Sequence, residues 1–338
     1  MLPRMRRVDQ RGVGGLRVHH GPPDAAAAPR YTGIRTFARV PHSTRWDEAD
    51  VAVLGVPFDT AVSWKTGARF GPAAIRDQSL LLKPWHPKLE VDVFGRLSVI
   101  DGGDIAITPG NAEQSAGQIA AGLAPVIEAG AVPIVLGGDH SIVLGELRAH
   151  AAAHGPVGVV LLDAHADTWD QYYGERYFHG TPFRRAMEEG LIDPSRSFLA
   201  GMRGSLYESA DLDTPREWGF EILTTEELRA LSPAEYGRRV RERLGDGPAY
   251  LSFDIDVFDP AFAPATGTPE VAGLQPQEAL DLLRALAGVR FEGFDLVEVS
   301  PPYDVAEITA MAGQRVIQEA LSGIALRRSG REARPARH

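Results

Sequence analysis

The chain has 338 residues, of which 44% are hydrophobic and 24% charged, and its formal charge at neutral pH is −10. This composition indicates a globular protein with a substantial core, and the acidic balance argues against a general nucleic-acid or anionic-membrane surface. The absence of cysteine excludes disulfides, thiolate metal sites and cysteine nucleophiles. Any metal must therefore be held by oxygen and imidazole ligands, which favour manganese or magnesium, with zinc or nickel possible.

Residues 1–30 contain no continuous apolar segment of the kind a signal peptide requires, and they are interpreted as a flexible extension. No internal repeat or linker interrupts residues 31–326, which we expect to form a single domain. Residues 327–338 are basic and contain proline, a pattern typical of a disordered tail. No stretch reaches the roughly 18 apolar residues of a membrane span, so a cytoplasmic location is expected.

Apolar runs of β type alternate with helical patterns along the chain. The predicted strands are, in order, Val51–Val56, Leu97–Ile100, Val132–Leu136, Val157–Leu162, Ser197–Met202, Glu221–Leu223, Tyr250–Ile255 and Phe294–Val299. The predicted helices are Pro72–Leu82, Ala112–Glu128, Ile142–His154, Pro233–Leu244, Pro276–Leu286 and Ile308–Leu326. Uninterrupted apolar runs such as VPIVL and VGVVLL are typical of strands buried on both faces. The pattern predicts an α/β fold with a mostly parallel sheet of about eight strands and helices on both sides.

Polar side chains follow four of these strands at the point where each strand ends. They are His140 after VPIVL, then Asp163, His165 and Asp167 after VGVVLL, Asp254 and Asp256 after YLSF, and Glu298 after FDLV. Ligands of open parallel sheets bind beyond the carboxyl ends of the strands, so we expect these side chains to meet at one edge.

Each motif has an ordinary structural explanation when it is taken alone. The segment GGDHS suits a glycine turn followed by a helix cap, and a DxD pair after a strand is common in unrelated sites. Together, however, they place two histidines and four aspartates at one edge, and burying so many carboxylates without cations is unfavourable. A pair of divalent cations that share bridging carboxylates would offset this charge.

The segments GVPFDT, TGARFGPAAIR, GGDHS, DAHAD, FHGTPF, SFDIDVFDPAFAPATGTPE and LVEVSPPYD occur in this order. On these motifs, the chain resembles the ureohydrolase family, which contains arginase, agmatinase and guanidino-acid hydrolases, from about Tyr31 to Leu326. The resemblance implies a three-layer α/β/α fold, two Mn²⁺ ions per chain, and hydrolysis of a guanidino group to urea and an amine. It also implies a homo-oligomer, either a trimer or a hexamer.

The resemblance also assigns roles to individual residues. It gives one metal ion the ligands His140, Asp163, Asp167 and Asp254, and the other ion Asp163, His165, Asp254 and Asp256. Two such ions lower the pKa of a water molecule, so that hydroxide is available near neutral pH to attack the guanidinium carbon. Asp167 would carry a proton to the leaving amine, and His179 would exchange protons with solvent. Glu298 would pair with the substrate guanidinium, whose planar fork matches a carboxylate.

The substrate wall is expected to include the loop WDQYYGERYF at residues 169–178, with Tyr172 and Tyr173 as candidate contacts. Arg203 is a further candidate, but arginases carry acidic residues after the corresponding arginine, where this chain has Gly-Ser-Leu. This departure favours the agmatinase branch. Agmatine ends in an amine and 4-guanidinobutyrate in a carboxylate, and the loop offers side chains of both signs, Asp170 and Glu175 as well as Arg176. Agmatine is the first expected substrate, and 4-guanidinobutyrate, 3-guanidinopropionate or proclavaminate are the alternatives.

Two other functional classes, a zinc deacetylase and a regulatory subunit without activity, fit the motifs less well. A deacetylase of the same general fold uses one zinc ion and a smaller aspartate–histidine set, so the extra His140 and the DxD pair argue against it. A silent regulatory subunit would be expected to lack metal ligands, yet all six are present. The expected partner is a small guanidino compound, with neither nucleic acid nor membrane involved.

Overall fold

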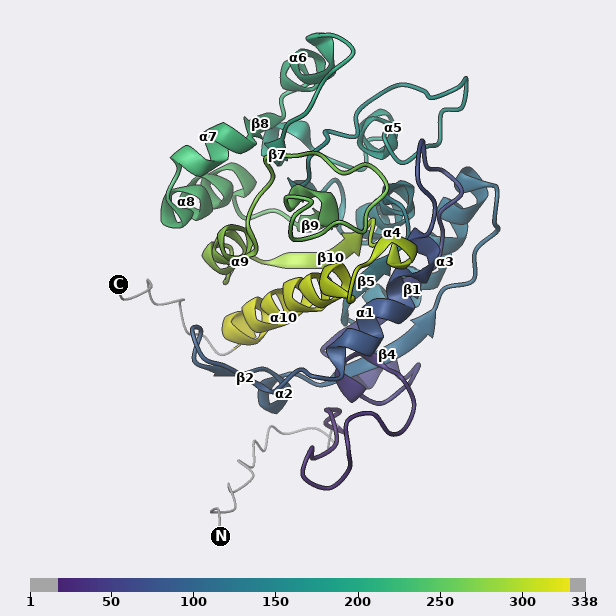
Figure 1. Ribbon diagram of the computed structural model, residues 1–338, viewed down its shortest axis with the longest axis vertical. Helices are drawn as coiled ribbons and strands as arrows, with labels where there is room; N and C mark the ends of the chain where they lie inside the picture. Colours follow the sequence, from purple (N-terminus) through teal and green to yellow (C-terminus); the bar gives the residue numbers. More distant parts are fainter. Residues whose placement is uncertain (1–17, 329–338) are drawn as a thin grey trace.

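The computed structural model describes residues 18–328, which are built around one eight-stranded parallel sheet (Figure 1). This confirms the predicted fold class. In spatial order the strands are β4 (Val99–Asp104), β1 (Val51–Val56), β5 (Val132–Gly137), β10 (Phe291–Val297), β9 (Ala249–Asp254), β6 (Gly158–Leu162), β7 (Phe198–Met202) and β8 (Glu221–Thr224). A separate two-stranded ribbon pairs β2 (Trp85–His86) with β3 (Val91–Asp92).

Helices cover both faces of the sheet because successive strand residues point into different cores. Val51 and Val53 of β1 belong to the core under α1 and α10, whereas Ala52 and Leu54 belong to the core under α3. The helices are α1 (Gly71–Ser79), α2 (Val93–Arg96), α3 (Ala112–Glu128), α4 (Val143–His154), α5 (Pro182–Glu188), α6 (Ala210–Glu217), α7 (Thr225–Ala230), α8 (Pro233–Leu244), α9 (Pro276–Ala285) and α10 (Ile308–Arg328). The result is a three-layer α/β/α sandwich.

The predicted elements are present, with ends that shift by up to four residues, and the short elements were missed. Helices α2, α5, α6 and α7 have four to eight residues each, which is too short for a helical apolar pattern to stand out. Strand β4 continues to Asp104, beyond the apolar run, because Asp104 still pairs with Gly55 of β1. Its polar side chains are bonded by the buried guanidinium of Arg76, at 2.9 and 3.0 Å to Asp101 and at 2.6 Å to Asp104.

The strand order explains why the polar motifs meet. Strands β5, β10, β9 and β6 are neighbours at the centre of the sheet, and each is followed by one motif at its carboxyl end. The turn after β5 must pass very close to the segment after β1, since a Cβ atom on Gly138 would lie 2.2 Å from the Phe58 carbonyl oxygen. Glycine is therefore required at this position for steric reasons.

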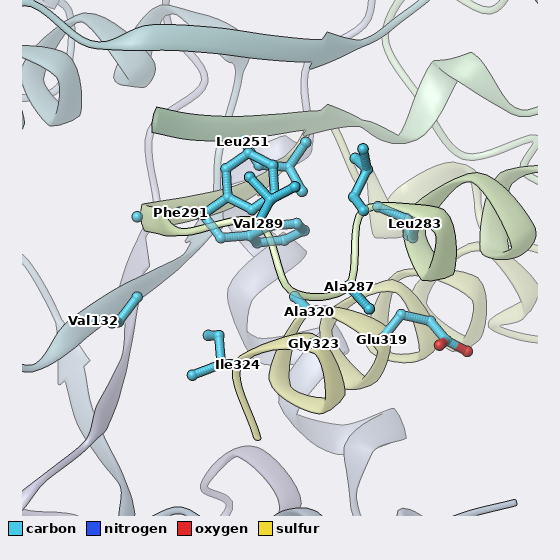
Figure 2. A pocket seen from close by; sticks show the side chains of 13 residues that line it. Val132, Leu251, Leu283, Ala287, Val289, Phe291, Glu319, Ala320, Gly323 and Ile324 are labelled. Carbon is cyan, nitrogen blue, oxygen red and sulfur yellow. The ribbon is translucent and has the colours of Figure 1, made fainter. Parts of the chain in front are cut away.

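A small apolar cavity lies at the opposite edge of the sheet, where the strands begin (Figure 2). Its walls include Val132 of β5, Phe291 of β10 and Ile324 of α10, and its volume is about 30 Å³. A space of this size accommodates only one or two water-sized groups, so it is too small for a guanidino compound.

The division into an extension, one domain and a tail stays a prediction, because residues 1–17 and 329–338 lie outside the described part. Within the predicted extension, His19 contacts the Phe94 carbonyl at 2.7 Å and His20 contacts Glu48 at 2.8 Å. Helix α10 runs to Arg328, two residues beyond its predicted end. Between residues 18 and 328, no helix is long and apolar enough to cross a membrane.

Candidate metal centre

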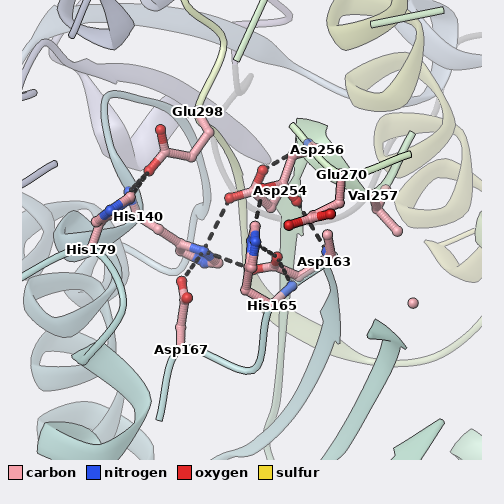
Figure 3. A network of polar contacts seen from close by, with 12 residues as sticks. His140, Asp163, His165, Asp167, His179, Asp254, Asp256, Val257, Glu270 and Glu298 are labelled. Carbon is pink, nitrogen blue, oxygen red and sulfur yellow. Dashed lines mark hydrogen bonds and ion pairs between the residues drawn. The ribbon is translucent and has the colours of Figure 1, made fainter. Parts of the chain in front are cut away.

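Three carboxylates surround one nitrogen of His140 at the carboxyl edge of the sheet (Figure 3). His140 Nδ1 lies 3.1 Å from Asp163 Oδ2, 2.9 Å from Asp167 Oδ2 and 3.3 Å from Asp254 Oδ2. His140 and Asp163 are fully buried, and Asp167 and Asp254 are nearly so. The structure therefore brings together the four residues predicted to hold the first ion.

The second predicted set lies beside the first. His165 Nδ1 is 3.0 Å from Asp256 Oδ2 and 3.6 Å from Asp163 Oδ1. In each of the groups His140–Asp163–Asp167 and Asp163–His165–Asp256, the potential ligand atoms lie within 4.8 Å of one another. Asp163 is common to both groups, as a bridging ligand must be.

Local spacing fixes how Asp163 and Asp254 point, and a contact between two strand ends fixes Asp256. Asp163 Oδ1 accepts a hydrogen bond from the backbone N–H of His165 at 2.6 Å, and Asp254 Oδ1 accepts one from Asp256 N–H at 2.8 Å. Asp256 Oδ1 accepts from Ala164 N–H at 3.0 Å. Such turns, in which an aspartate bonds a backbone group two residues on, are a local property of the sequence. One oxygen of each carboxylate is thus held by the backbone, and the other is turned toward the histidines.

The atoms turned inward fit a metal site. In the part of the chain that the structure describes, His140 Nδ1, Asp163 Oδ2 and Asp256 Oδ2 are buried and make no hydrogen bond, although they lie near other polar atoms. Burial, followed by the charges of Asp256 and Asp163, raises the pKa of Asp254 well above its ordinary value. Burial, followed by the charge of Asp163, raises the pKa of Asp256 to about 6. A carboxylate set that is unfavourable alone and has unpaired inward atoms is suited to hard divalent cations.

Glu298 and His179 form a second unit next to this cluster (Figure 3). Glu298 Oε1 accepts hydrogen bonds from the backbone N–H of His140 at 2.9 Å and from His179 Nδ1 at 3.0 Å. Glu298 Oε2 is buried and, among the described residues, has no hydrogen-bond partner. This oxygen is an acceptor without a partner in the described chain, and Glu298 does not line the cavity next to the cluster.

Ser63 orients His179 from the opposite side, and the sequence analysis did not identify it. Its backbone N–H donates to His179 Nε2 at 3.0 Å, and its hydroxyl lies 2.8 Å from the same atom. Nε2 therefore accepts, which places the proton of the neutral ring on Nδ1, toward Glu298. Burial lowers the pKa of His179, but the hydrogen bond and charge of Glu298 outweigh it, and the net shift is upward. Only the position of Ser63, shortly after the GVPFDT motif, pointed toward the site.

The backbone is strained at two of these positions. Asp167 has φ of 50° and Glu298 has φ of 64°, in the left-handed region that residues with a Cβ atom seldom adopt. Strain of this kind costs about 1–3 kcal/mol and persists where surrounding structure enforces it, which is common at functional sites.

A cavity of about 250 Å³ opens beside the cluster, with His165 and Asp167 in its wall. The remaining wall comes from the segments after β6 and β7, from α6 and from β8: Ala164, Ala166, Thr168, Trp169, Met202, Arg203, Gly204, Ser205, Leu206, Asp211, Leu212 and Thr224. Arg203, a predicted substrate contact, lines this cavity but directs its guanidinium to backbone carbonyls. These belong to Gly201, Asp256, Val257, Phe258, Glu270 and Val271. Its geometry supports a role in bracing the loop after Asp256.

Two of the three charged residues of the loop at 169–178 are paired with helix α5. Asp170 contacts Arg185 at 2.6 Å, and Arg176 contacts Glu188 at 2.8 Å. Neither Asp170 nor Arg176 is part of the cavity wall. Their charges therefore give no basis for choosing a substrate.

The aromatic residues of the loop stack on one another. The Tyr172 ring lies 5.0 Å from Trp169 and 5.4 Å from Phe178, measured between ring centres. Tyr173 is 81% exposed at the outside of this group. Trp169 is the member of this group that lines the cavity, and Tyr172 packs against it, whereas Tyr173 contacts Tyr172 and Phe178.

The amino-acid sequence of most of the chain is similar to a known family and to several of its members. Residues 49–323 match the model of the Arginase family. The chain is 43% identical over 300 residues to mitochondrial agmatinase from Gallus gallus, which covers 89% of this chain and 88% of that protein. It is 42% identical over 305 residues to guanidinobutyrase from Pseudomonas aeruginosa, which covers 89% of this chain and 96% of that protein.

Solved structures agree with this result. Proclavaminate amidinohydrolase from Streptomyces clavuligerus superposes with a TM-score of 0.84 at 41% identity, covering 89% of this chain and 100% of that one. A crystal structure of Trypanosoma cruzi formiminoglutamase with Mn²⁺ superposes with a TM-score of 0.77 at 27% identity, covering 84% and 96% of the two chains.

Proposed function

Because the chain belongs to the arginase family, we propose that it hydrolyses agmatine to putrescine and urea at a centre of two Mn²⁺ ions. The chain is a ureohydrolase, that is, a hydrolase that acts on the C–N bonds of guanidino groups. The observation that carries the choice of substrate is the charge of the cavity wall beside the cluster.

The wall of the cavity favours a substrate with a cationic far end. Among the described lining residues, Arg203 is the only arginine or lysine, and its guanidinium is occupied by backbone carbonyls. Asp211 of α6 adds a half-buried carboxylate to the wall. Its Oδ2 accepts hydrogen bonds from the backbone N–H groups of Tyr207 at 2.9 Å and Glu208 at 3.4 Å, which orient the side chain without neutralising its charge. The primary amine of agmatine would be attracted to this carboxylate, whereas the carboxylate of a guanidino acid would be repelled.

The alternative substrate is 4-guanidinobutyrate or a related guanidino acid. Ser205 lines the cavity and offers a hydroxyl that can donate to a carboxylate. Relatives of about equal identity include both a guanidinobutyrase and a guanidinopropionase. The resemblance to these relatives supports the alternative, and the lack of a free basic side chain on the wall weighs against it.

The residues of the cluster divide into two ligand sets. We assign His140 and Asp167 to one ion, His165 and Asp256 to the other, and Asp163 to both; the remaining ligand, Asp254, contacts the first set. When bound, such cations lower the pKa of a water molecule and so supply a nucleophile near neutral pH. The donor set of imidazole and carboxylate is one that Mn²⁺ accepts.

The other side chains bind the substrate and move protons. The unpaired Oε2 of Glu298 accepts from the guanidinium N–H groups and holds the substrate carbon next to the cluster. Burial, followed by the charge of Asp163, raises the pKa of Asp167, which suits this carboxyl to taking up a proton and passing it to the leaving amine. His179, held by Ser63 and Glu298, would exchange that proton with solvent.

The test is urea release by manganese-loaded protein from agmatine, 4-guanidinobutyrate, 3-guanidinopropionate and arginine. We expect kcat/KM to be highest for agmatine. The D211N variant should raise KM for agmatine and not for 4-guanidinobutyrate, while D213N, on the exposed side of the same helix, should change neither. Higher activity with a guanidino acid would overturn the choice of agmatine. No urea from any compound, with one zinc ion or no metal bound, would overturn the whole proposal.

The homo-oligomeric assembly and the cytoplasmic location stay predictions. Size-exclusion chromatography with light scattering tests the first, since a trimer or hexamer is expected.

A further inference from the structure

Behind His140, on the side away from the carboxylate cluster, lies a chain of buried polar side chains. His140 Nε2 is 2.9 Å from Ser252 Oγ, and Ser252 Oγ donates to Asp295 Oδ1 at 2.7 Å. Tyr250 hydroxyl lies 2.9 Å from Asp295 Oδ2 and also contacts the carboxyl of Glu146. All five side chains are fully buried. The chain joins strands β9 and β10 to helix α4 and ends at a predicted metal ligand.

Counting protons fixes the tautomer of His140. A serine hydroxyl has one proton, and Ser252 gives it to Asp295, so Ser252 must accept from His140. In the neutral imidazole, the form that binds a metal, the single proton is therefore on Nε2 and Nδ1 has the lone pair. That lone pair faces the cluster, where Nδ1 makes no hydrogen bond within the described part of the chain. A metal ligand is commonly oriented in this way by its other ring nitrogen.

The number of protons available also shows which carboxyl group carries the negative charge at the Glu146 end of the chain of side chains. Tyr250 also has a single proton, yet its oxygen lies between two carboxyl groups. Asp295 accepts hydrogen bonds from Ser252, Tyr250 and the backbone N–H of Phe253, so three donors stabilise its charge. Glu146 contacts only Tyr250, and its Oε1 has no partner among the described residues. Glu146 is therefore the group that holds a proton, which it donates to the Tyr250 oxygen.

The pKa shifts of the two carboxyl groups agree with this assignment of the proton to Glu146. Burial, followed by the charge of Asp295, raises the pKa of Glu146 well above its ordinary value. Burial also raises the pKa of Asp295, to about 6, while the charge of His140 and the hydrogen bonds from Ser252, Tyr250 and Phe253 N–H oppose the rise. The chain then contains one negative charge, on Asp295, toward which the hydrogen bonds from both ends are directed.

We propose that Asp295, Tyr250 and Glu146 are positioning residues that hold His140 with its Nδ1 lone pair toward the metal, and that Glu146 acts as a neutral acid completing this chain. The inference rests on the proposed metal centre but not on the identity of the substrate. It goes beyond that function because these three side chains touch neither the cluster nor the cavity.

The first test measures Mn²⁺ affinity without substrate, by titration against a chelator with free Mn²⁺ followed by electron paramagnetic resonance. D295N removes the charge that polarises the Ser252–His140 pair, and we expect one of the two ions to bind about 10–100-fold more weakly. Y250F should weaken the same ion by a smaller factor. E146Q should retain wild-type affinity, since its amide N–H donates to Tyr250 as the acid does, whereas E146L should not.

The matched control is Y236F, since Tyr236 is also fully buried but its hydroxyl has no hydrogen-bond partner in the described residues. This variant should bind both ions as the wild type does. Unfolding of the metal-free proteins identifies variants that are merely less stable. Wild-type affinity for both ions in D295N and in Y250F would overturn the positioning role. A wild-type protein that binds no metal would instead reject the metal centre itself.

The second test detects the proton on Glu146 directly. Infrared difference spectra of wild type against E146Q at neutral pH should contain a protonated-carboxyl C=O band that belongs to the wild type. If only ionised-carboxylate bands differ, Glu146 is charged and the proton count is wrong. Failure to release urea from any guanidino compound would leave both tests standing, so the two proposals can fail independently.

Discussion

Replacing Asp163 should empty both halves of the metal centre, whereas replacing Asp256 should empty only one. Asp163 Oδ2 is 3.1 Å from His140 Nδ1, and its Oδ1 is 3.6 Å from His165 Nδ1, so it belongs to both ligand sets. Of the two histidines in the described cluster, Asp256 contacts only His165, at 3.0 Å. Asparagine is the suitable substitution in both cases because its oxygen can keep the backbone hydrogen bond that orients the side chain.

The size of the effect follows from the number of sites lost. A ligand that binds only the folded protein stabilises it by about 2.7 kcal/mol when its concentration is 100 times Kd. With two independent sites, manganese at that concentration should raise the free energy of unfolding of the wild type by about 5 kcal/mol. The same addition should stabilise D256N by about 2.7 kcal/mol and D163N hardly at all.

Two measurements check this prediction. Metal content after gel filtration should be two ions per chain in the wild type, one in D256N and none in D163N. Denaturant unfolding with manganese and with chelator should give the corresponding stabilisation. The D170N variant is the control, since Asp170 pairs with Arg185 outside the cluster and should behave as the wild type. One ion retained in D163N, or both lost in D256N, would refute the assignment of Asp163 as the shared ligand.

Three further predictions concern other parts of the structure. H179A should keep both ions and lower kcat by about 10²–10⁴-fold, the usual contribution of a positioned proton-transfer group, as measured by urea release alongside metal content; loss of metal would contradict it. R203M should lower the free energy of unfolding in urea by about 3 kcal/mol or more, because several charge-assisted hydrogen bonds of about 1.5 kcal/mol each are lost. Burial, followed by the charge of His154, lowers the pKa of His150 to about 3 in the folded protein. Between about pH 6.5 and pH 3 the unfolded chain therefore binds more protons at this residue than the folded protein does. The free energy of unfolding should fall as the pH drops through this range. H150L should show a smaller loss of stability between pH 7 and pH 5 than the wild type, and an unchanged slope would show that His150 is not the cause.

Local sequence determined the chemistry of the centre. The apolar runs before each motif identify buried parallel strands, and the alternating Asp-x-His and Asp-x-Asp spacing determines the side-chain directions. The reason is local: the backbone N–H two residues after Asp163 or Asp254 binds one carboxylate oxygen and turns the other inward. Six ligand residues could therefore be named before any fold was known.

The choice among substrates could not be made in the same way, because it depends on which charges are already paired. Asp170, Arg176 and Arg203 all looked available to a ligand in the sequence. In the folded chain the first two pair with α5, and the third donates to carbonyls that lie up to 68 residues away. Asp211, which does line the cavity, belongs to a short helix that the sequence pattern did not indicate.

Contacts across the sheet depend on strand order, which no local pattern encodes. The order β1-β5-β10-β9-β6 brings His140 to within hydrogen-bond distance of Ser252, 112 residues away, and Ser63 to within hydrogen-bond distance of His179, 116 residues away. Residue types and their directions were thus determined by the sequence itself. Tertiary structure alone decided which lone pairs are free, which charged side chains are already paired and which buried acid holds a proton. Each of these depends on partners that only folding brings together.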